Sequence, residues 1–280
     1  MSTRATNPAA VEAVLDARRK GAFVHVEDVW STSVVFEIDA PELTVHELFA
    51  ARDAVVEFVH HVDEVFSTFK SHSLVSQLRD GRLHETDIEA MASAGNRGAD
   101  ELVQVIRLCR KALVATRGAF DPWGVAGGFD PSGLVKGWAA GKSLDILRAH
   151  GVRRAFVNCG GDAAAMSDGV PWTAGITDPD DTTRLVKGLP ITNGAIATSG
   201  TYERGDHVID PHASGVRAEG ARSATVVGPD AALADAFATA LCVDGAASID
   251  WFLELGPEWS LYFIPVGSDR TAYKYGEAVS

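Results

Sequence analysis

The feature that most constrains the fold is an apolar stretch, "ADAFATALCVDG", at residues 234–245. Its composition predicts a helix that is buried in the protein interior. Asp235 and Thr239 lie four residues apart in this stretch, so on a helix their side chains project from the same side, one turn apart. Such an oxygen pair is either a set of satisfied hydrogen bonds, with Thr239 bonded to its own backbone and Asp235 to a neighbour, or a ligand set for Mg²⁺.

Composition and charge limit the classes of protein that this chain can represent. It has 280 residues, 46% of them hydrophobic, which suits one large domain or two intimately packed lobes. The formal net charge of −13 argues against nucleic acid as a partner, because an acidic surface repels a phosphate backbone. A bound phosphate would therefore need a local positive charge or a metal ion.

The cysteines and the apolar stretches bear on the cellular compartment. Cys109, Cys159 and Cys242 form no CxxC pair, so the sequence predicts neither a zinc site nor a disulfide framework and favours a reducing compartment. Residues 1–23 lack the apolar run of a signal peptide, and no stretch approaches the roughly 18 apolar residues of a membrane helix. We expect a cytoplasmic protein without membrane insertion.

Hydrophobic periodicity predicts helices and strands in an irregular order. The expected helices lie at 44–69, 99–117, from about 132 to a cap at Gly151, and within 229–245. The expected strands lie at 23–38 (one strand or a pair), 153–158, 172–177, around 183–188, 223–228 and 259–265. Helices first, followed by strands mixed with helices, favour an α+β fold or an irregular α/β fold over regular βαβ alternation.

A segment rich in glycine, residues 118–134, leads into one of these helices. Asp130 precedes the helix start, and Lys136 follows one turn in, so the free backbone N–H groups and the lysine could bind a phosphate. The alternative is an ordinary capped helix with an exposed lysine. The nearby "GWAAGKS" at 137–143 is not a phosphate loop, since it has three residues between its glycines where that motif needs four.

Two further polar segments could each form a ligand site or have only a structural role. "CGGD" at 159–162 places two glycines after a strand, which lets a ligand approach the backbone or simply makes a tight turn containing Asp162. His207 lies in a polar stretch at 194–211 and is either a general base or an ordinary surface histidine.

Taken together and in order, six blocks resemble the ApbE family of flavin transferases. They are "GAFDP", "FDPSGLVKGWA", "LRAHGVRRAFVNCGGD", "AIATSGTYER", "HVIDP" and "ADAFATAL". The likeness extends from about residue 25 to residue 265. It implies an α+β, ApbE-like fold of mixed sheets with packed helices, with the site in a cleft between two intimately associated lobes.

The resemblance also implies roles for individual residues. Asp235 and Thr239 would bind Mg²⁺, with a backbone carbonyl near Gly133. His207 would be the catalytic base. The residues that would contact FAD are Phe69, Ala119, Phe120, Asp121, Asp130, Lys136 and Ile209. Trp30 and Ser31 stand where the family usually has Met and Gly.

The activity implied by the resemblance is Mg²⁺-dependent FAD:protein FMN transfer. FAD would be cleaved at its pyrophosphate, FMN attached through a phosphoester bond to a Thr or Ser of a target flavoprotein, and AMP released. The alternatives are an FAD pyrophosphatase that yields FMN and AMP, and a catalytically idle FAD-binding protein. We expect an N-terminal arm or short helix at 1–22, a single flavin transferase domain at 23–270 and a C-terminal tail at 271–280.

Overall fold

The frame of the protein is an eight-stranded sheet. The computed structural model describes residues 21–179, 181–200, 220–265 and 273–276. The strand order is β1-β2-β3-β4-β7-β8-β9-β10, and each neighbouring pair is antiparallel. The strands are β1 (Phe23–Val29), β2 (Thr32–Asp39), β3 (Arg154–Cys159), β4 (Asp162–Met166), β7 (Gly194–Gly200), β8 (Ala221–Gly228), β9 (Ser260–Pro265) and β10 (Tyr273–Gly276).

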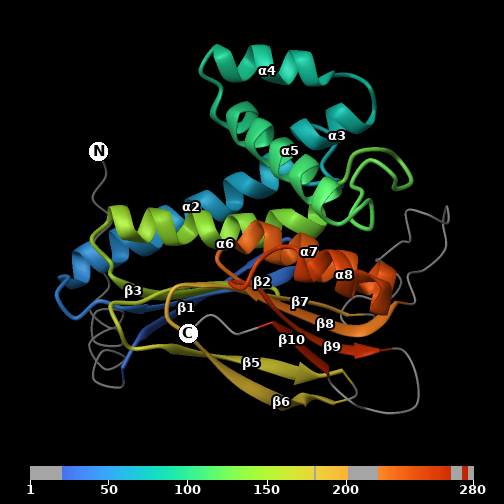
Figure 1. Ribbon diagram of the computed structural model, residues 1–280. Coiled ribbons are helices and arrows are strands. Elements are labelled where there is room, and N and C mark those ends of the chain that lie inside the picture. Colours follow the sequence, from blue (N-terminus) through green and yellow to red (C-terminus); the bar gives the residue numbers. More distant parts are fainter. Residues whose placement is uncertain (1–20, 180, 201–219, 266–272, 277–280) are drawn as a thin grey trace.

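Helices cover one face of this sheet, and a hairpin covers part of the other (Figure 1). Helices α2 (Val45–Phe66), α6 (Ser132–Ala149) and α7 (Ala231–Asp244) lie on the first face, followed by the short η1 (Gly245–Ser248) and α8 (Ile249–Leu253). On the opposite face lies the antiparallel hairpin of β5 (Trp172–Asp178) and β6 (Asp181–Ile191). The α+β class is therefore confirmed, and the expected mixed sheets are antiparallel throughout the described strands.

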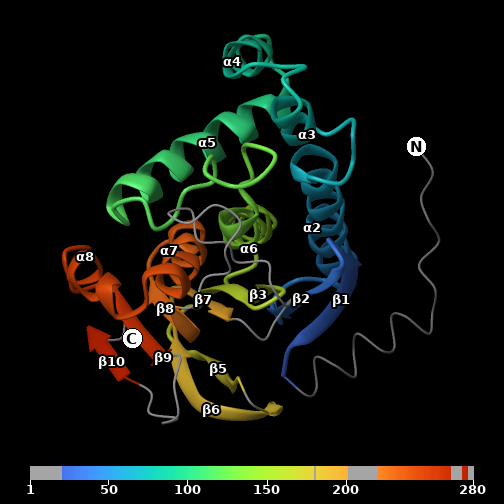
Figure 2. The same ribbon diagram turned by 90° about the vertical axis from the view of Figure 1, so that its right-hand side faces the viewer.

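Three further helices form an outer layer. These are α3 (Leu74–Arg79), α4 (Glu85–Ser93) and α5 (Arg97–Ala115), and Figure 2 shows them on the side of α6 that is remote from the sheet. The side chain of Asn96 caps α5 by accepting a hydrogen bond from the backbone N–H of Ala99. Helix α5 presents apolar residues to the interior, which include Leu102, Ile106 and Cys109.

The alternation of side chains along the central strands divides the interior into two cores. On β4, Ala164 and Met166 belong to the large cluster beneath the helices, whereas Ala163 and Ala165 belong to a smaller cluster beneath the hairpin. The smaller cluster includes Trp172.

Helices α6 and α7 approach each other closely. Gly133, Gly137 and Gly141 follow one another at intervals of four residues on α6, and a β-carbon on Gly137 would lie 2.1 Å from the backbone oxygen of Ala231. Only glycine permits this approach, which brings Asp235 of α7 against the backbone of α6.

Most of the elements expected from periodicity are present. The stretch 23–38 is a pair of strands, joined at Trp30 and Ser31 with positive φ angles of 59° and 57°. Gly151 follows α6 with a φ of 86°, as expected of a residue that ends a helix. The expected N-terminal arm or helix lies outside the described residues.

The three cysteines and one apolar helical stretch are buried in the fold. Cys109, Cys159 and Cys242 are free and buried, in agreement with the absence of a disulfide framework. The continuous helical stretch Ala231–Leu253 reaches the length and hydropathy of a membrane span, which the sequence analysis did not expect. Because 72% of its most apolar window is buried inside the protein, its apolarity is explained by the core position of α7.

Candidate functional site

The site begins at the contact between α6 and α7. Asp235 is 1% exposed, and its Oδ2 accepts a hydrogen bond of 3.0 Å from the backbone N–H of Gly137. Thr239 lies one turn along α7, where its hydroxyl oxygen is 3.0 Å from the position that a β-carbon on Gly133 would occupy. The structure thus brings together the three residues that the sequence analysis assigned to Mg²⁺.

Gly133 contributes an irregularity in the first turn of α6. Its φ and ψ angles of −79° and 16° are not helical, so its carbonyl is turned from the direction of a regular helix. A carboxylate, a hydroxyl and a backbone carbonyl are all hard oxygen donors, the type that Mg²⁺ prefers. The described residues contain no cluster of three or more His, Cys, Asp or Glu side chains suited to a metal, so any Mg²⁺ here would also need water or ligand oxygens.

Lys136 connects this oxygen cluster to a cavity. Its Nζ lies 3.8 Å from Oδ1 of Asp235, and it also pairs with Oδ2 of Asp162 at the start of β4. The same lysine lines a cavity of about 340 Å³ together with Ser132 of α6. A charged ammonium group therefore stands between the buried carboxylates and an open space.

Three aromatic side chains lie in the walls of this cavity, among polar residues and two valines. They are Trp30 at the β1–β2 turn, Phe66 at the end of α2, and Phe69 in the segment that follows. Within the described part of the chain the buried Nε1 of Trp30 has no hydrogen-bond partner. Aromatic side chains next to polar groups suit a planar organic ligand that also carries charge.

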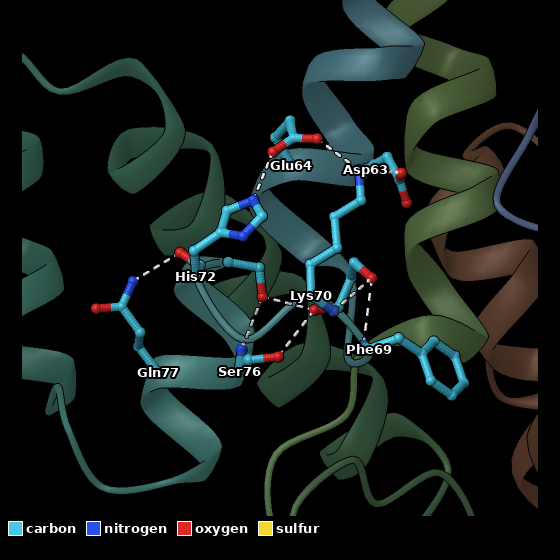
Figure 3. Close-up of polar contacts among 9 residues, drawn as sticks. Asp63, Glu64, Phe69, Lys70, His72, Ser76 and Gln77 are labelled. Atoms are coloured by element: carbon cyan, nitrogen blue, oxygen red, sulfur yellow. Dashed lines mark hydrogen bonds and ion pairs between the residues drawn. The ribbon is translucent and has the colours of Figure 1, made fainter.

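Phe69 is fully presented to solvent on a rigid backbone. Its side chain is 97% exposed, yet its backbone N–H and that of Lys70 each donate to the hydroxyl of Ser67 at 3.2 Å. Figure 3 shows Phe69 pointing away from this network, and Lys70 reaching toward Asp63 and Glu64. The Nζ of Lys70 lies 2.6 Å from Asp63 and 2.5 Å from Glu64.

Hydrogen bonds and opposite charges stabilise the ionised form of Glu64 in this network. Bonds from Lys70 and from His72, 2.7 Å away, lower the pKa of the Glu64 carboxyl from 4.5 to about 2. The segment that carries Phe69 is thereby tied to the last turns of α2 by charged groups.

The loop between α5 and α6 carries four more of the predicted FAD contacts. Ala119 and Phe120 are buried, and Cε2 of Phe120 is 3.3 Å from the position of a β-carbon on Gly133. Asp121 accepts a hydrogen bond of 2.9 Å from the backbone N–H of Trp123. Phe120 thus lies directly against the start of α6.

Asp130 holds the end of this loop. Its Oδ1 accepts from the backbone N–H of Ser132 at 3.0 Å, and its Oδ2 lies 3.2 Å from Arg79 of α3. Arg79 also donates to the backbone oxygens of Ala126 and Phe129. Sequence reasoning missed Arg79, since nothing near it in the sequence marks a site.

Two further residues lie close to the oxygen cluster: Ser199, which the sequence did not predict, and Asp162, for which it left two roles open. The hydroxyl of Ser199 on β7 lies 3.3 Å from that of Thr239. Asp162, which the sequence left between a turn former and a ligand contact, is 0% exposed and pairs with Lys136. The predicted base His207 and the predicted FAD contact Ile209 lie outside the described residues.

Burial also sets the protonation state of Cys159, at the end of β3. It raises the pKa of Cys159 to about 12, an effect that Lys136 opposes and Asp235 reinforces. Cys159 is therefore a neutral packing residue and not a nucleophile.

Comparisons with known proteins address the family directly. Residues 125–263 match the model of the ApbE family. The chain is 36% identical over 129 residues to the FAD:protein FMN transferase of Rhodobacter capsulatus, an alignment that covers 41% of this chain and 24% of that protein. It is 34% identical over 128 residues to the enzyme of the same name from Escherichia coli K12, covering 41% and 36%. The chain thus spans about a quarter to two fifths of the length of the curated relatives that it matches.

Solved structures show the same fold over most of the chain. The flavinyl transferase ApbE of Pseudomonas stutzeri, in its apo form, superposes with a TM-score of 0.72 at 17% identity, covering 92% of this chain and 98% of that one. The ApbE protein of Thermotoga maritima superposes with a TM-score of 0.69 at 22% identity, covering 86% and 94%. The matched sequence model, the curated relatives and the shared fold agree, and this chain belongs to the ApbE family.

Proposed function

We propose that the protein is a Mg²⁺-dependent FAD:protein FMN transferase. It would cleave FAD at the pyrophosphate, attach FMN through a phosphoester bond to a Thr or Ser of a target flavoprotein, and release AMP. Proteins named FAD:protein FMN transferase are among its relatives. The single observation that carries the proposal is the position of Lys136, which lines the same cavity as Trp30 and Phe66 and lies 3.8 Å from the carboxylate of Asp235.

This geometry supports the binding of a flavin dinucleotide. The aromatic side chains of Trp30, Phe66 and Phe69 suit the planar isoalloxazine ring, which gains most from contact with flat apolar surfaces. The ammonium group of Lys136 would bind a diphosphate oxygen beside the start of α6. In a chain with a net charge of −13, such a local cation is needed to hold a phosphate.

The donor set supports a divalent cation next to the diphosphate. Asp235, Thr239 and the carbonyl of Gly133 would hold Mg²⁺, which leaves the remaining positions to water and phosphate oxygens. When bound, Mg²⁺ would neutralise charge on the diphosphate and orient the phosphorus that is attacked.

The chemical step balances with the groups assigned to it. The acceptor hydroxyl oxygen would form a bond to the phosphorus of the FMN half while the bond from that phosphorus to the bridging oxygen breaks, so AMP departs with the bridging oxygen. His207 would accept the proton of the acceptor hydroxyl, which is a weak nucleophile until it loses that proton. This role of His207 remains a prediction from the family resemblance.

The test is to identify the products by mass spectrometry. The full chain is incubated with FAD and Mg²⁺, with and without a flavoprotein subunit that carries an acceptor threonine. A covalent FMN adduct on the acceptor together with AMP is the expected result. Free FMN and AMP in equal amounts, without an adduct, would identify an FAD pyrophosphatase. A yellow protein that retains intact FAD at saturating Mg²⁺ would identify an idle FAD-binding protein and overturn the proposal.

A further inference from the structure

A buried carboxylate outside the predicted site residues lies next to Lys136. Asp162 opens β4 and is 0% exposed. Because side chains alternate along a strand, it shares the helix-facing side of the sheet with Ala164 and Met166. A buried charged group at this position requires a partner.

The turn before Asp162 fixes the direction of its side chain. Gly160 and Gly161 have φ angles of 64° and 103°, and the N–H of Gly161 donates to the side-chain oxygen of Asn158 at 2.8 Å. A β-carbon on Gly160 would lie 2.8 Å from the hydroxyl of Thr32, so this turn is also packed against β2. The carboxylate is therefore presented toward α6 by a rigid support.

Asp162 and Asp235 compete for one ammonium group. Lys136 Nζ makes its direct contact with Oδ2 of Asp162, whereas Oδ1 of Asp235 is more distant, at 3.8 Å. Within the described residues Oδ1 of Asp162 has no hydrogen-bond partner. The cluster contains two carboxylates and one ammonium, so its formal charge of −1 leaves room for a cation.

The flexible side chain of Lys136 allows its ammonium group to move between the two carboxylates. Without the Asp162 carboxylate, the ammonium group would close the remaining gap to Asp235 and pair with it directly. It would then cover the oxygen that a divalent cation needs and repel that cation at short range.

We infer that Asp162 is a positioning residue that holds Lys136 away from Asp235 and so keeps the Asp235 carboxylate available to a divalent cation. This inference rests on the metal site of the proposed function. The turn at Gly160 and Gly161, which orients Asp162, would thereby contribute to metal affinity.

The experiment measures Mn²⁺ binding to the full chain by electron paramagnetic resonance, without FAD, so that no turnover is needed. For Asp162→Asn we expect the dissociation constant for Mn²⁺ to rise by about tenfold or more, since a nearby ammonium opposes the cation. The double variant Asp162→Asn/Lys136→Met removes the competing ammonium and should return the dissociation constant to the wild-type value.

Two controls separate this inference from the proposed function. Asp235→Asn should abolish the site, and if wild type and Asp235→Asn bind Mn²⁺ equally, the metal assignment fails and the inference fails with it. Asp39→Asn breaks an ion pair of 2.7 Å between β2 and β3, with Arg154, at the end of these strands remote from Asp162, and should leave Mn²⁺ affinity unchanged.

The remaining outcomes bear on Asp162 alone. An unchanged affinity in Asp162→Asn would overturn the inference while the metal site stands. A weakened affinity that Lys136→Met does not restore would overturn it too, because Asp162 would then act as a direct ligand. Thermal denaturation verifies that each variant is folded, and Asp162→Ser is measured in the same way should Asp162→Asn fail to fold.

Discussion

A β-carbon added to Gly137 would lie 2.1 Å from the backbone oxygen of Ala231 on the neighbouring helix. No rotation of a side chain can relieve this overlap, because the obstructing atom belongs to the backbone. The substitution Gly137→Ala would force α6 and α7 apart. We expect a loss of about 1–3 kcal/mol or more in the free energy of unfolding, measured by urea denaturation.

Gly141→Ala is the matched control on the same helix. Its added β-carbon would lie 3.8 Å from the nearest atom, the β-carbon of Ala231, which is ordinary contact. Alanine favours a helix over glycine by up to about 1 kcal/mol, so this variant should be neutral or more stable. Equal destabilisation of both variants would contradict the close approach of α6 and α7 at Gly137.

The second prediction concerns the hydroxyl of Thr239. Thr239→Val has nearly the same shape but no oxygen, whereas Thr239→Ser retains the hydroxyl. If Thr239 is a metal ligand, Thr239→Val should lose Mg²⁺-dependent AMP release from FAD and Thr239→Ser should keep most of it. Chromatographic assay of AMP against Mg²⁺ concentration measures the difference. Full activity of Thr239→Val would remove this residue from the ligand set.

The third prediction concerns the exposed ring of Phe69. Because the ring is 97% exposed, Phe69→Ala should change the free energy of unfolding by less than about 0.5 kcal/mol. Loss of an aromatic contact worth about 0.5–1.5 kcal/mol should weaken FAD binding roughly 2- to 12-fold. Fluorescence titration with FAD measures the affinity. Val114→Ala, on α5 and 78% exposed, is the control and should alter neither quantity.

The fourth prediction concerns the reactivity of the thiols. Cys109, Cys159 and Cys242 are buried, and burial raises the pKa of Cys159 to about 12. At pH 8 the reactive thiolate form of Cys159 is therefore almost absent, and burial keeps the reagent from all three thiols in the folded protein. Ellman's reagent should detect no rapid reaction before unfolding and three thiols in urea. A thiol that reacts within seconds in the native protein would contradict the packing described.

The fifth prediction concerns pH and the segment that carries Phe69. The folded protein lowers the pKa of Glu64 from 4.5 to about 2, so the ionised carboxylate stabilises the fold. This contribution is fully present above pH 4.5 and is lost as the pH falls toward 2. The difference in melting temperature between wild type and Glu64→Gln should therefore shrink across that range. A difference that stays constant from pH 6 to pH 2 would show that the carboxylate charge has no part in it.

Local sequence pattern was sufficient for the elements with strong periodicity. Helix α2 follows its apolar spacing and begins at Thr44, whose side chain accepts from the N–H of Glu47 in a capping box. Helix α7 is buried on nearly all sides, as its composition indicates.

Other elements depend on contacts that a sequence does not display. Strand β4 is "DAAAM", and alanine favours helices, so its extended form results from packing between the helices and the hairpin. In α4 only Ile88 is buried, which leaves too little apolar periodicity to predict a helix.

The sequence predicted which residues share a helix face in the site, but not which residues from distant elements pair with them. The spacing of Asp235 and Thr239 indicated a shared helix face, and both now lie against glycines of α6. The pairing of Lys136 with Asp162 joins residues 26 positions apart through the meeting of a helix with a strand end. No local pattern encodes that distance, so the choice between turn former and functional residue stayed open.

The β5–β6 hairpin offers a route for engineering. Among the described residues, its core shares no buried residue with the cluster beneath the helices, and the oxygen cluster with Lys136 lies on the helical side of the sheet. A randomised library restricted to the inner positions of the hairpin would thus explore solubility and heat tolerance while the oxygen cluster and Lys136 stay unchanged. Such a library would give a stabilised scaffold in which weak substitutions around Asp235 could be studied without loss of the folded state.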